Sequence, residues 1–495
     1  MGFRADALRK WFLAISSSIA LTCATPACAE GPPDPDLGRT STLLLSNAFD
    51  KLEAMAAAYR KTDARASGGT PKLEIFYDAL ASFAHEQNCH ANPHEDTFEN
   101  KNGALERWLI AKPDSIAAHV AMAQLWINYG WKARGCSYIA GVTEEGQRLY
   151  VERLTKAGSY LKGITPTADP HIYIELDELA RISGSPEIVV ANYSAAVGNH
   201  PDYFPYYSMR ANALEEKWYG QPGDVAAFEK SLLTSPGGAT GQIAYAWVAT
   251  SLYDEFPRAE VFQDLGLDWP ALKRAYETKQ QTYGLSEHDL NAALIYSSLA
   301  HDDDFAQGTV AQIRTLAEKG FVLDELNLGW AYIWGHGVPQ SPKDAVFWYR
   351  KAAAVGNTTA EYQLGWIYEQ IQPEGYPQGY AEALKWYRLA AAQGYPVAKN
   401  NLAFLYEHGH GVEQDYAKAA QLYREAADQR NARAAFHLGV MYFDGHGVPK
   451  NDGEALKWME LSEGLHDEEA RKWLADHAAQ FDGTVGSDDR SPLQP

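Results

Sequence analysis

Apolar residues in the last third of the chain recur with a period of about 36 residues. Leucines head four corresponding segments at Leu328, Leu364, Leu402 and Leu438, and a segment rich in paired alanines follows each of them. The leucine-headed segments carry the pattern L-G-x-x-Y, with Gly or Ala after the leucine, where we expect the two backbones to approach closely. Apolar residues three and four positions apart are typical of amphipathic helices, so each unit is predicted to be a helix pair. One pair cannot bury its apolar face alone. The pattern therefore predicts an all-α fold in which the pairs stack as an α/α solenoid.

Glycines and helix-starting residues mark the turns of these pairs. The sequence "GHGV" occurs three times, with histidines at His336, His410 and His446. Glycine adopts the positive φ that a chain needs where a helix ends and turns. Ser341 before a proline, and Asn451, are typical residues at the start of the second helices. Because stacking spaces equivalent loops along one edge, we interpret the histidines as turn residues and not as metal ligands.

The four segments resemble Sel-one-like repeats, a subfamily of tetratricopeptide-like helix pairs. The resemblance covers 323–480 as four repeats and a charged capping helix, "DEEARKWLADHAAQ". A degenerate helix pair is expected over 286–322, because Tyr296 and Gly320 continue the same spacing. The known role of this family is to assemble partner proteins. The resemblance implies a non-enzymatic scaffold and no catalytic residues.

One face of each first helix packs on the second helix. Three columns of residues lie on the face next to it. In tetratricopeptide-like stacks that neighbouring face lines a concave groove. The candidate protein-binding residues there are Trp330, Trp366, Phe404, Tyr362, Phe436, Phe443, Glu369 and Glu407. The aromatic side chains would anchor a peptide or helix, and the glutamates would favour a basic one. The alternative is that these side chains only pack between adjacent first helices.

The region 43–285 also reads as helices, because no stretch alternates for long enough to predict a sheet. One helix is expected over 43–61, and another is expected to start at Pro113. It resembles a bacterial domain of unknown function that often accompanies such repeats, with Lys217, Trp218 and Gly220 in its KW-x-G element. We interpret Trp131, Trp218 and Tyr203 as core aromatic residues. The intervening 30–42 is expected to be a linker, and 481–495 a disordered tail.

Residues 1–29 have the features of a signal peptide, with Arg4, Arg9 and Lys10 before a short apolar stretch and "ACA" at its end. Cleavage near Ala29 would give a periplasmic or secreted protein. A lipoprotein is the alternative, because cysteines lie close to this site. In an oxidising compartment the remaining Cys89 and Cys136 are expected to form a disulfide.

The net charge of the chain argues against some classes of binding partner. The formal net charge is −21, which argues against nucleic acid, because a phosphate backbone needs a basic surface. No stretch after the signal peptide is apolar for long enough to predict a membrane span. We expect a protein or peptide partner and no cofactor.

Two local patterns raise the question of catalysis or metal binding. "HEQNCHANPHED" holds His85, His90 and His94, but their spacing does not fit a zinc-binding helix, and its Pro and Asn residues favour a loop. An S-x-x-K pair, Ser159 and Lys162, resembles the nucleophile motif of serine β-lactamases without its companion motifs. A periplasmic hydrolase of the β-lactamase or cell-wall amidase type is therefore an alternative function. Within the binding class, an immunity-like inhibitor of a secreted toxin is another.

Overall fold

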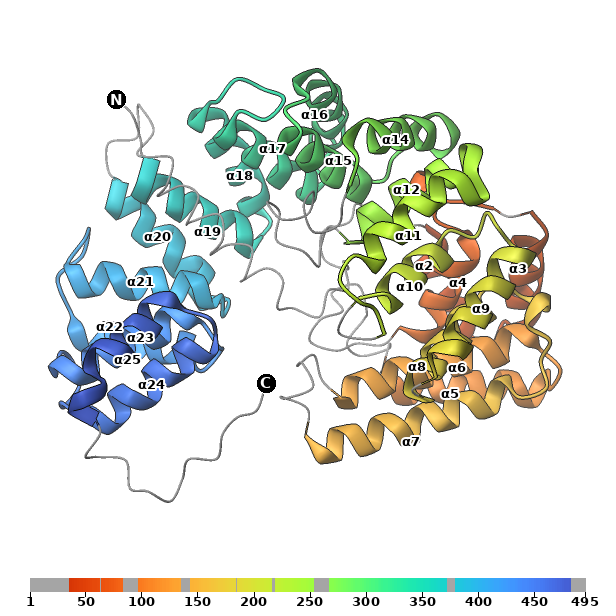
Figure 1. Cartoon of the computed structure of the whole chain (residues 1–495), viewed down its shortest axis with the longest axis horizontal. Helices are drawn as coiled ribbons and strands as arrows, with labels where there is room; N and C mark the ends of the chain where they lie inside the picture. Colours follow the sequence, from red (N-terminus) through yellow and green to blue (C-terminus); the bar gives the residue numbers. More distant parts are fainter. Residues whose placement is uncertain are drawn as a thin grey trace. The chain divides into compact units, whose positions relative to one another are not determined.

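The structure is a computed structural model, and it describes residues 35–62, 64–82, 97–134, 143–183, 185–215, 219–252, 267–371 and 379–481. Helices follow one another through all of these ranges (Figure 1). Between the described residues, β-type pairing is limited to one isolated bridge from Arg65 to Pro71. The predicted all-α fold class is confirmed. The chain divides between Asp324 and Glu325 into two compact units.

The first unit is built from long helices and a few short 3-10 or π turns, which are labelled η. Its elements are α2 (Pro35–Leu45), α3 (Phe49–Thr62), η1 (Ser67–Gly69), α4 (Lys72–Ala81), α5 (Phe98–Ala111), α6 (Ile116–Arg134), α7 (Glu144–Leu161), η3 (Pro166–Ala168), α8 (Ile172–Ser183), α9 (Pro186–Asn199), α10 (Pro205–Ala213), α11 (Asp224–Leu232), η4 (Leu233–Gly237), α12 (Gly238–Leu252), α14 (Trp269–Tyr283), α15 (Glu287–Leu299) and α16 (Asp303–Ala317).

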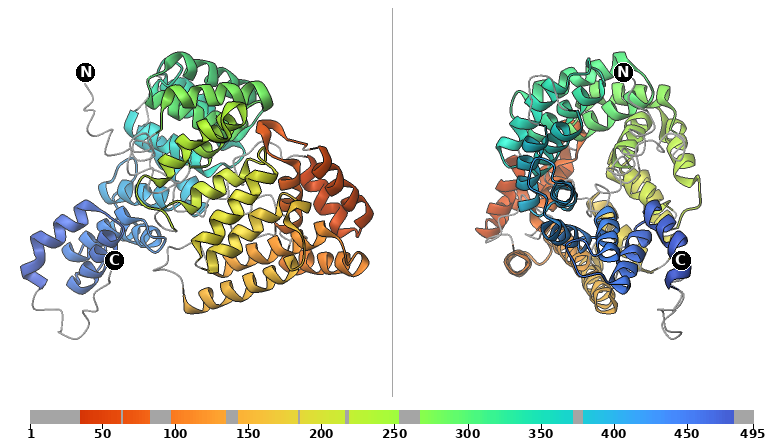
Figure 2. Two further views of the ribbon diagram at one scale, coloured as in Figure 1. Left: turned by 45° about the vertical axis from the view of Figure 1, so that its right-hand side comes forward. Right: turned by 90° about the vertical axis from the view of Figure 1, so that its left-hand side faces the viewer.

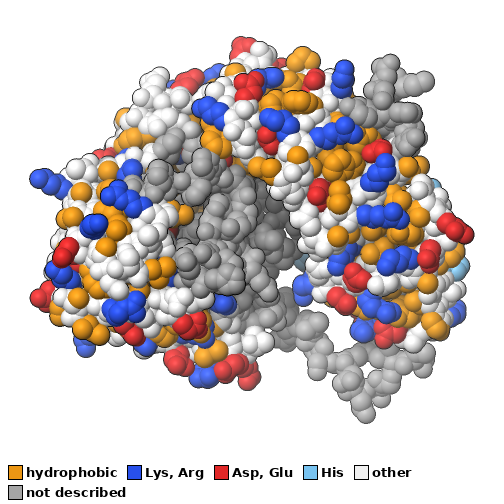
Figure 3. Space-filling view, turned by 180° about the vertical axis from the view of Figure 1, so that it is seen from behind, with side chains coloured by type: hydrophobic (Ala, Val, Ile, Leu, Met, Phe, Trp, Pro, Cys, Tyr) orange, Lys and Arg blue, Asp and Glu red, His pale blue; other side chains and the backbone are white. Residues whose placement is uncertain are grey.

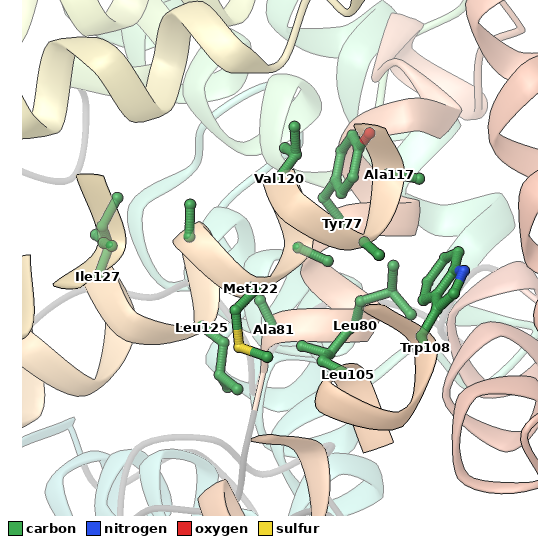
Figure 4. Close-up of a cluster of buried hydrophobic side chains, with 14 of the residues drawn as sticks. Tyr77, Leu80, Ala81, Leu105, Trp108, Ala117, Val120, Met122, Leu125 and Ile127 are labelled. Carbon is green, nitrogen blue, oxygen red and sulfur yellow. The ribbon is translucent and has the colours of Figure 1, made fainter. Parts of the chain in front are cut away.

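Helix α6 lies at the centre of the first part of this unit, since α4, α5, α7 and α8 all pack against it. It is apolar on nearly every side, and Val120, Met122 and Leu125 are fully buried. These side chains lie in one cluster with Tyr77 of α4 and Trp108 of α5 (Figure 4). A helix that is hydrophobic all round is stable only when other elements cover it. That requirement explains its central place.

The start of the chain's first unit differs from the sequence expectation in two places. Residues 43–61 were expected to form one helix, but Asn47 has a positive φ of 58° and separates α2 from α3. Helix α2 begins at Pro35, inside the expected linker over 30–42, because Leu44 and Thr40 are fully buried and fix it to the core. Tyr203 is a core residue as predicted, whereas Trp131 is half-buried against the Tyr150 ring. Trp218 lies outside the described residues.

Within the range of the expected degenerate helix pair, α15 and α16 pack on each other. Their descent from a repeat stays a prediction. Asp302 belongs to an acidic run that the sequence alone would place in solvent. It caps α16 by accepting a hydrogen bond from Phe305 N. It also accepts hydrogen bonds from Trp269 Nε1 at 3.0 Å and Lys273 Nζ at 2.7 Å. The hydrogen bond from Lys273 holds the pKa of Asp302 below its usual range. This carboxylate therefore ties α14 to α16.

The second unit contains the repeats, and Figures 1 and 2 show their helices following one another in sequence order. Its elements are α17 (Val322–Trp334), which crosses the division between the units, α18 (Pro342–Ala354), α19 (Thr358–Trp366), η5 (Ile367–Ile371), α20 (Gly379–Ala392), α21 (Pro396–His408), α22 (Tyr416–Ala427), α23 (Ala432–Asp444), α24 (Asp452–Gly464) and α25 (Glu468–Phe481). Each helix from α18 to α25 packs against the next one along the chain. The charged helix α25 follows the fourth pair, in the position expected for a cap.

Glycine in the L-G-x-x-Y pattern sets the approach of the two helices in a pair. A Cβ on Gly329 would lie 2.7 Å from the Tyr349 ring, and one on Gly365 would lie 2.5 Å from the Tyr387 ring. Ordinary Cβ contacts are longer, so a side chain at these positions would push the second helix away. The prediction that glycine allows a close approach at this position is confirmed.

The "GHG" turns join neighbouring repeats as well as ending their own helices. As predicted, the histidines lie in turns, and His410 N donates to the carbonyl of Leu405 after Gly409 adopts φ 68°. The His410 ring stacks on Tyr380 of the preceding repeat, with centroids 4.4 Å apart. The following Gly411 has a positive φ, and a Cβ there would lie 2.7 Å from the backbone of Tyr380. The same stacking recurs one repeat later between His446 and Tyr416.

An arginine–tyrosine contact also recurs between successive repeats. Arg350 donates to the Tyr368 hydroxyl at 2.9 Å, and Arg388 donates to the Tyr406 hydroxyl at 2.7 Å. Arg424 makes the same hydrogen bond to Tyr442. In each case the arginine lies in a second helix and the tyrosine in the next repeat. The tyrosine of L-G-x-x-Y thus has a structural partner that recurs with the period.

Candidate protein-binding surface of the repeats

The structure divides the eight predicted groove residues by burial. Trp330, Phe404, Phe436 and Phe443 are half-buried, whereas Tyr362 and Trp366 are only 3% and 6% exposed. Tyr362 lies against the rings of other buried tyrosines, and Trp366 packs on Trp334, with centroids 6.3 Å apart. Trp366 therefore fits the predicted alternative, packing between adjacent first helices, whereas Tyr362 packs on the second helix of its own repeat. The half-buried residues are the ones that retain area for a partner.

The two predicted acidic groove residues are held by tyrosines of their own repeats. Tyr387 donates to Glu369 Oε2 at 2.6 Å, and Tyr423 donates to Glu407 Oε2 at 2.7 Å. Burial raises the pKa of the Glu369 carboxyl, and the hydrogen bond from Tyr387 limits the rise. Both carboxylates therefore support the packing of a first helix on its second helix. Their presence alone does not select a basic partner.

Histidine and aromatic rings surround Phe404. His408 lies 4.1 Å from it by ring centroids, His410 lies 5.9 Å away, and His437 lies 6.4 Å away. Burial lowers the pKa of His437 to about 4, so this ring is neutral near pH 7. Aromatic pairs at these separations contribute about 0.5–1.5 kcal/mol beyond the area they bury. The result is a half-buried surface of rings that crosses from α21 to α23.

Phe443 occupies a different environment at the end of the array. Trp473 of α25 lies 5.2 Å from its ring in a T-shaped arrangement, and His477 also lies 5.2 Å away. The capping helix therefore covers part of Phe443. We define the aromatic face of the repeats as the remaining half-buried residues Trp330, Phe404 and Phe436.

Other exposed apolar residues of the repeats were missed from the sequence. Phe347 in α18 is 56% exposed and Leu389 in α20 is 49% exposed. They lie on second helices. The column of Phe347 holds Lys or Gln in the other repeats, and the column of Leu389 holds Lys351 in α18 and Glu425 in α22. Figure 3 shows hydrophobic side chains among Lys and Arg over the repeat unit, on its right-hand side. The columns of the second helices could have revealed these residues, because an apolar residue in an otherwise polar column departs from the pattern.

A buried polar cluster in the first unit was also missed. Asp169 accepts hydrogen bonds from Arg60 Nε at 2.6 Å and from Tyr77 Oη at 2.5 Å. Beside it, His171 Nδ1 lies 2.9 Å from Tyr203 Oη, and His171 Nε2 lies 3.3 Å from Glu175 Oε1. Burial alone would lower the pKa of His171, but the hydrogen bond and charge of Glu175 outweigh it and raise that pKa. The spacing of His171 and Glu175, four apart on a helix, was the available signal.

This cluster has the residue types of acid–base chemistry but no access to solvent. His171 and Glu175 are each 2% exposed, and Asp169 is fully buried. A general acid or base must come within hydrogen-bonding reach of its substrate. The cluster therefore joins α4 to the start of α8 and to the residues before α10.

The other candidates for chemistry are placed as follows. Ser159 and Lys162 are both exposed, and the Ser159 hydroxyl donates to the carbonyl of Lys156 at the end of α7. Among the described residues, no group of three or more His, Cys, Asp or Glu is arranged to hold a metal ion. The stretch with His85, and the predicted Cys89–Cys136 disulfide, lie outside the described residues. So do the signal peptide, the tail and most of the KW-x-G element, so these remain predictions.

The repeats match a known family. Residues 325–357, 358–395, 396–431 and 432–462 each match the model of the Sel1 repeat. The second unit is an array of Sel1 repeats. Sel1 repeats generally mediate protein–protein interaction. None of the described helices is both long and apolar enough to cross a membrane.

Two solved structures of other proteins are similar to this chain. A Sel1 repeat protein from Oxalobacter formigenes is 27% identical, and the match covers 45% of this chain and 89% of that one, with a TM-score of 0.36. A protective antigen with an SLR fold, present in uropathogenic Escherichia coli strains, is 16% identical, and the match covers 90% of this chain and 99% of that one, with a TM-score of 0.35. No curated protein matches this chain.

Proposed function

We propose that this protein is an exported, non-enzymatic adaptor that binds a segment of another protein through the aromatic face of its Sel1 repeats. The signal-peptide features of residues 1–29 support export. The observation that carries the proposal is that Trp330, Phe404 and Phe436 are only half-buried, whereas Tyr362 and Trp366 of the same predicted face are buried. Aromatic side chains of this kind are enriched in the centres of protein interfaces.

The partner's chemistry follows from these rings. A peptide or helix with apolar anchor residues would gain contact area on them, as in helix-in-groove recognition. Glu369 and Glu407 are acidic groups next to this face, and each accepts a hydrogen bond from a tyrosine of its own repeat. A basic residue beside the apolar anchors would therefore add to affinity. The aromatic rings provide the contact area of the proposed site, and the carboxylates add affinity for a basic residue beside it.

Selection from a random-peptide phage library against the purified protein tests this proposal. Selected peptides should contain aromatic or aliphatic anchors, and Phe404→Ala with Phe436→Ala should weaken their binding by about tenfold or more. Phe347→Ala removes an exposed ring of the second helices and is the matched control, with little expected effect. Thermal melting of each variant separates lost binding from lost folding. Peptides whose binding survives the first-helix variants and disappears with Phe347→Ala would refute the assignment of the face.

A further inference from the structure

A cationic pocket lies where the third and fourth repeats meet. It has a volume of about 540 Å³, and its walls come from α22, α23, α24 and the turn before α24. The lining residues that matter for its chemistry are Arg424, Tyr442, Lys450, Glu454, Lys457 and Trp458. Three cations thus surround a pocket that holds one carboxylate, in a chain whose net charge is −21.

The lining side chains are oriented by contacts within the repeats. Arg424 donates to the Tyr442 hydroxyl, which directs the guanidinium along the junction. Lys450 Nζ lies 4.9 Å from the centre of the Phe443 ring, and Lys457 Nζ lies 5.1 Å from the centre of the Trp458 ring. These rings support the lysine stems while leaving their ammonium groups in water.

The acidic groups near the pocket neutralise it only in part. Glu454 accepts a hydrogen bond from Trp458 Nε1 at 3.1 Å and lies 3.6 Å from Lys457 Nζ. Asp452 lies 3.8 Å from Lys450 Nζ, a long separation for an ion pair. Both lysines are more than half exposed, at 58% and 64% of the side chain. Exposed pairs of this kind contribute little, so the lysines can exchange them for another anion.

The preceding junction has the same scaffold with different chemistry. Arg388 donates to Tyr406 there as Arg424 does to Tyr442. At the positions of the two pocket lysines it has Gln414 and Gln421, and at the tryptophan it has Leu422. At the positions of the proline, asparagine and glutamate, it has Glu413, Asp415 and Lys418, so its charges cancel. The first junction shares the arginine, glutamate, lysine and tryptophan, as Arg350, Glu382, Lys385 and Trp386. Lys450 therefore gives the last junction more positive charge than either of the other two.

We propose that this pocket binds an acidic segment of a protein, through carboxylates that Arg424, Lys450 and Lys457 contact and an apolar part that lies on Trp458. This inference rests on the proposed adaptor function and adds a second, acidic determinant to the partner. Guanidinium and ammonium groups form their strongest hydrogen bonds with carboxylates or phosphates. The acidic remainder of the chain repels long polyanions such as nucleic acids, but screening beyond about 10 Å lets a short acidic segment enter.

Titration of the full-length protein with a fluorescein-labelled, C-terminally amidated hexaglutamate peptide tests the inference. At an ionic strength of about 0.1 M, where the rest of the chain's charge is screened, the peptide should bind saturably. Lys450→Gln with Lys457→Gln should weaken binding by about tenfold or more, since two charge-assisted contacts are lost. Adding salt should weaken binding of the native protein more than that of the double variant.

Arg424→Gln and Arg388→Gln are a matched pair for separating binding from folding. Each removes one arginine–tyrosine hydrogen bond between repeats, so their melting temperatures should fall by similar amounts. Arg424→Gln should weaken hexaglutamate binding several-fold, and Arg388→Gln by less than about twofold. Equal losses for both variants, or absence of saturable binding to the native protein, would overturn the pocket assignment. If the phage-selected peptides still bind while hexaglutamate does not, the pocket inference fails and the adaptor function stands.

Discussion

Glu229 in α11 has a carboxyl group that is buried without a partner. Its side chain is 1% exposed, and neither oxygen has a hydrogen-bond partner among the residues that the structure describes. Burial raises the pKa of this carboxyl well above its usual range, because a buried charge is costly. The folded protein therefore keeps a proton that the unfolded chain releases above a pH of about 4.3. Folding stability from this group is present at low pH and is lost as pH rises toward the folded-state pKa.

Glu229→Gln should raise the melting temperature at pH 8 by a few degrees. Glutamine has the same shape and needs no proton to stay neutral, so the gain should shrink toward zero near pH 4.5. Glu187→Gln, an exposed residue of α9, is the control and should show no such pH dependence. Thermal melts of the three proteins across this pH range measure the effect. A gain for Glu229→Gln that is the same at pH 4.5 and pH 8 would show that the carboxyl is not protonated in the folded state.

Residue types alone could not have revealed Glu229. It lies in "DVAAFEKSL", where a glutamate beside a lysine resembles an ordinary solvent-facing position. The same is true of Asp302, which reads as part of an acidic run but joins two helices. Burial of a single side chain depends on which distant helix covers it. That information is not in the local pattern.

At the scale of helices, the L-G-x-x-Y glycines offer a direct test of packing. Gly365→Ala should reduce the free energy of unfolding by about 1–3 kcal/mol, because its Cβ would meet the rigid Tyr387 ring at 2.5 Å. Gly439→Ala faces the end of the flexible Met459 side chain at 3.0 Å. There the gain in helix propensity, about 1 kcal/mol, should offset the contact. Urea unfolding compares the two, and equal losses would contradict the role given to the tyrosine ring.

The periodic part of the chain was the most predictable from sequence. The second helices of the pairs, the helix caps Ser341 and Asn451, and the close approach at the glycines agree with the structure. Each of these features is local and recurs with the repeat. Element ends were less accurate elsewhere. α6 begins at Ile116 with Ser115 accepting from Ala118 N, slightly after the expected start at Pro113. The pattern also predicted which face of each first helix lies beside the face that packs on the second helix. It did not predict that neighbouring rings would bury Tyr362 and Trp366 on that face.

For the molecule as a whole, the two units differ in how their helices are held. The repeats are joined by contacts that recur with the period, such as arginine–tyrosine hydrogen bonds and histidine–tyrosine stacking. Arrays of this kind owe their stability to nearest-neighbour contacts. The first unit relies on a central apolar helix and on buried polar clusters around Asp169 and Asp289, which have no periodic signature. This difference explains why only the repeats could be assigned to a family by their residues.

The central claim is that the aromatic face of the Sel1 repeats binds a protein partner. Site-specific photo-cross-linking in the source cell tests it most directly, with benzoylphenylalanine in place of Phe404 or, as the control, in place of Phe347. Both positions accept a similar aromatic side chain, and each reports only on molecules in contact with it. We predict that the probe at position 404 captures one discrete protein and that the probe at position 347 does not. Capture of the same protein from position 347 alone, or of no protein from position 404, would contradict the account.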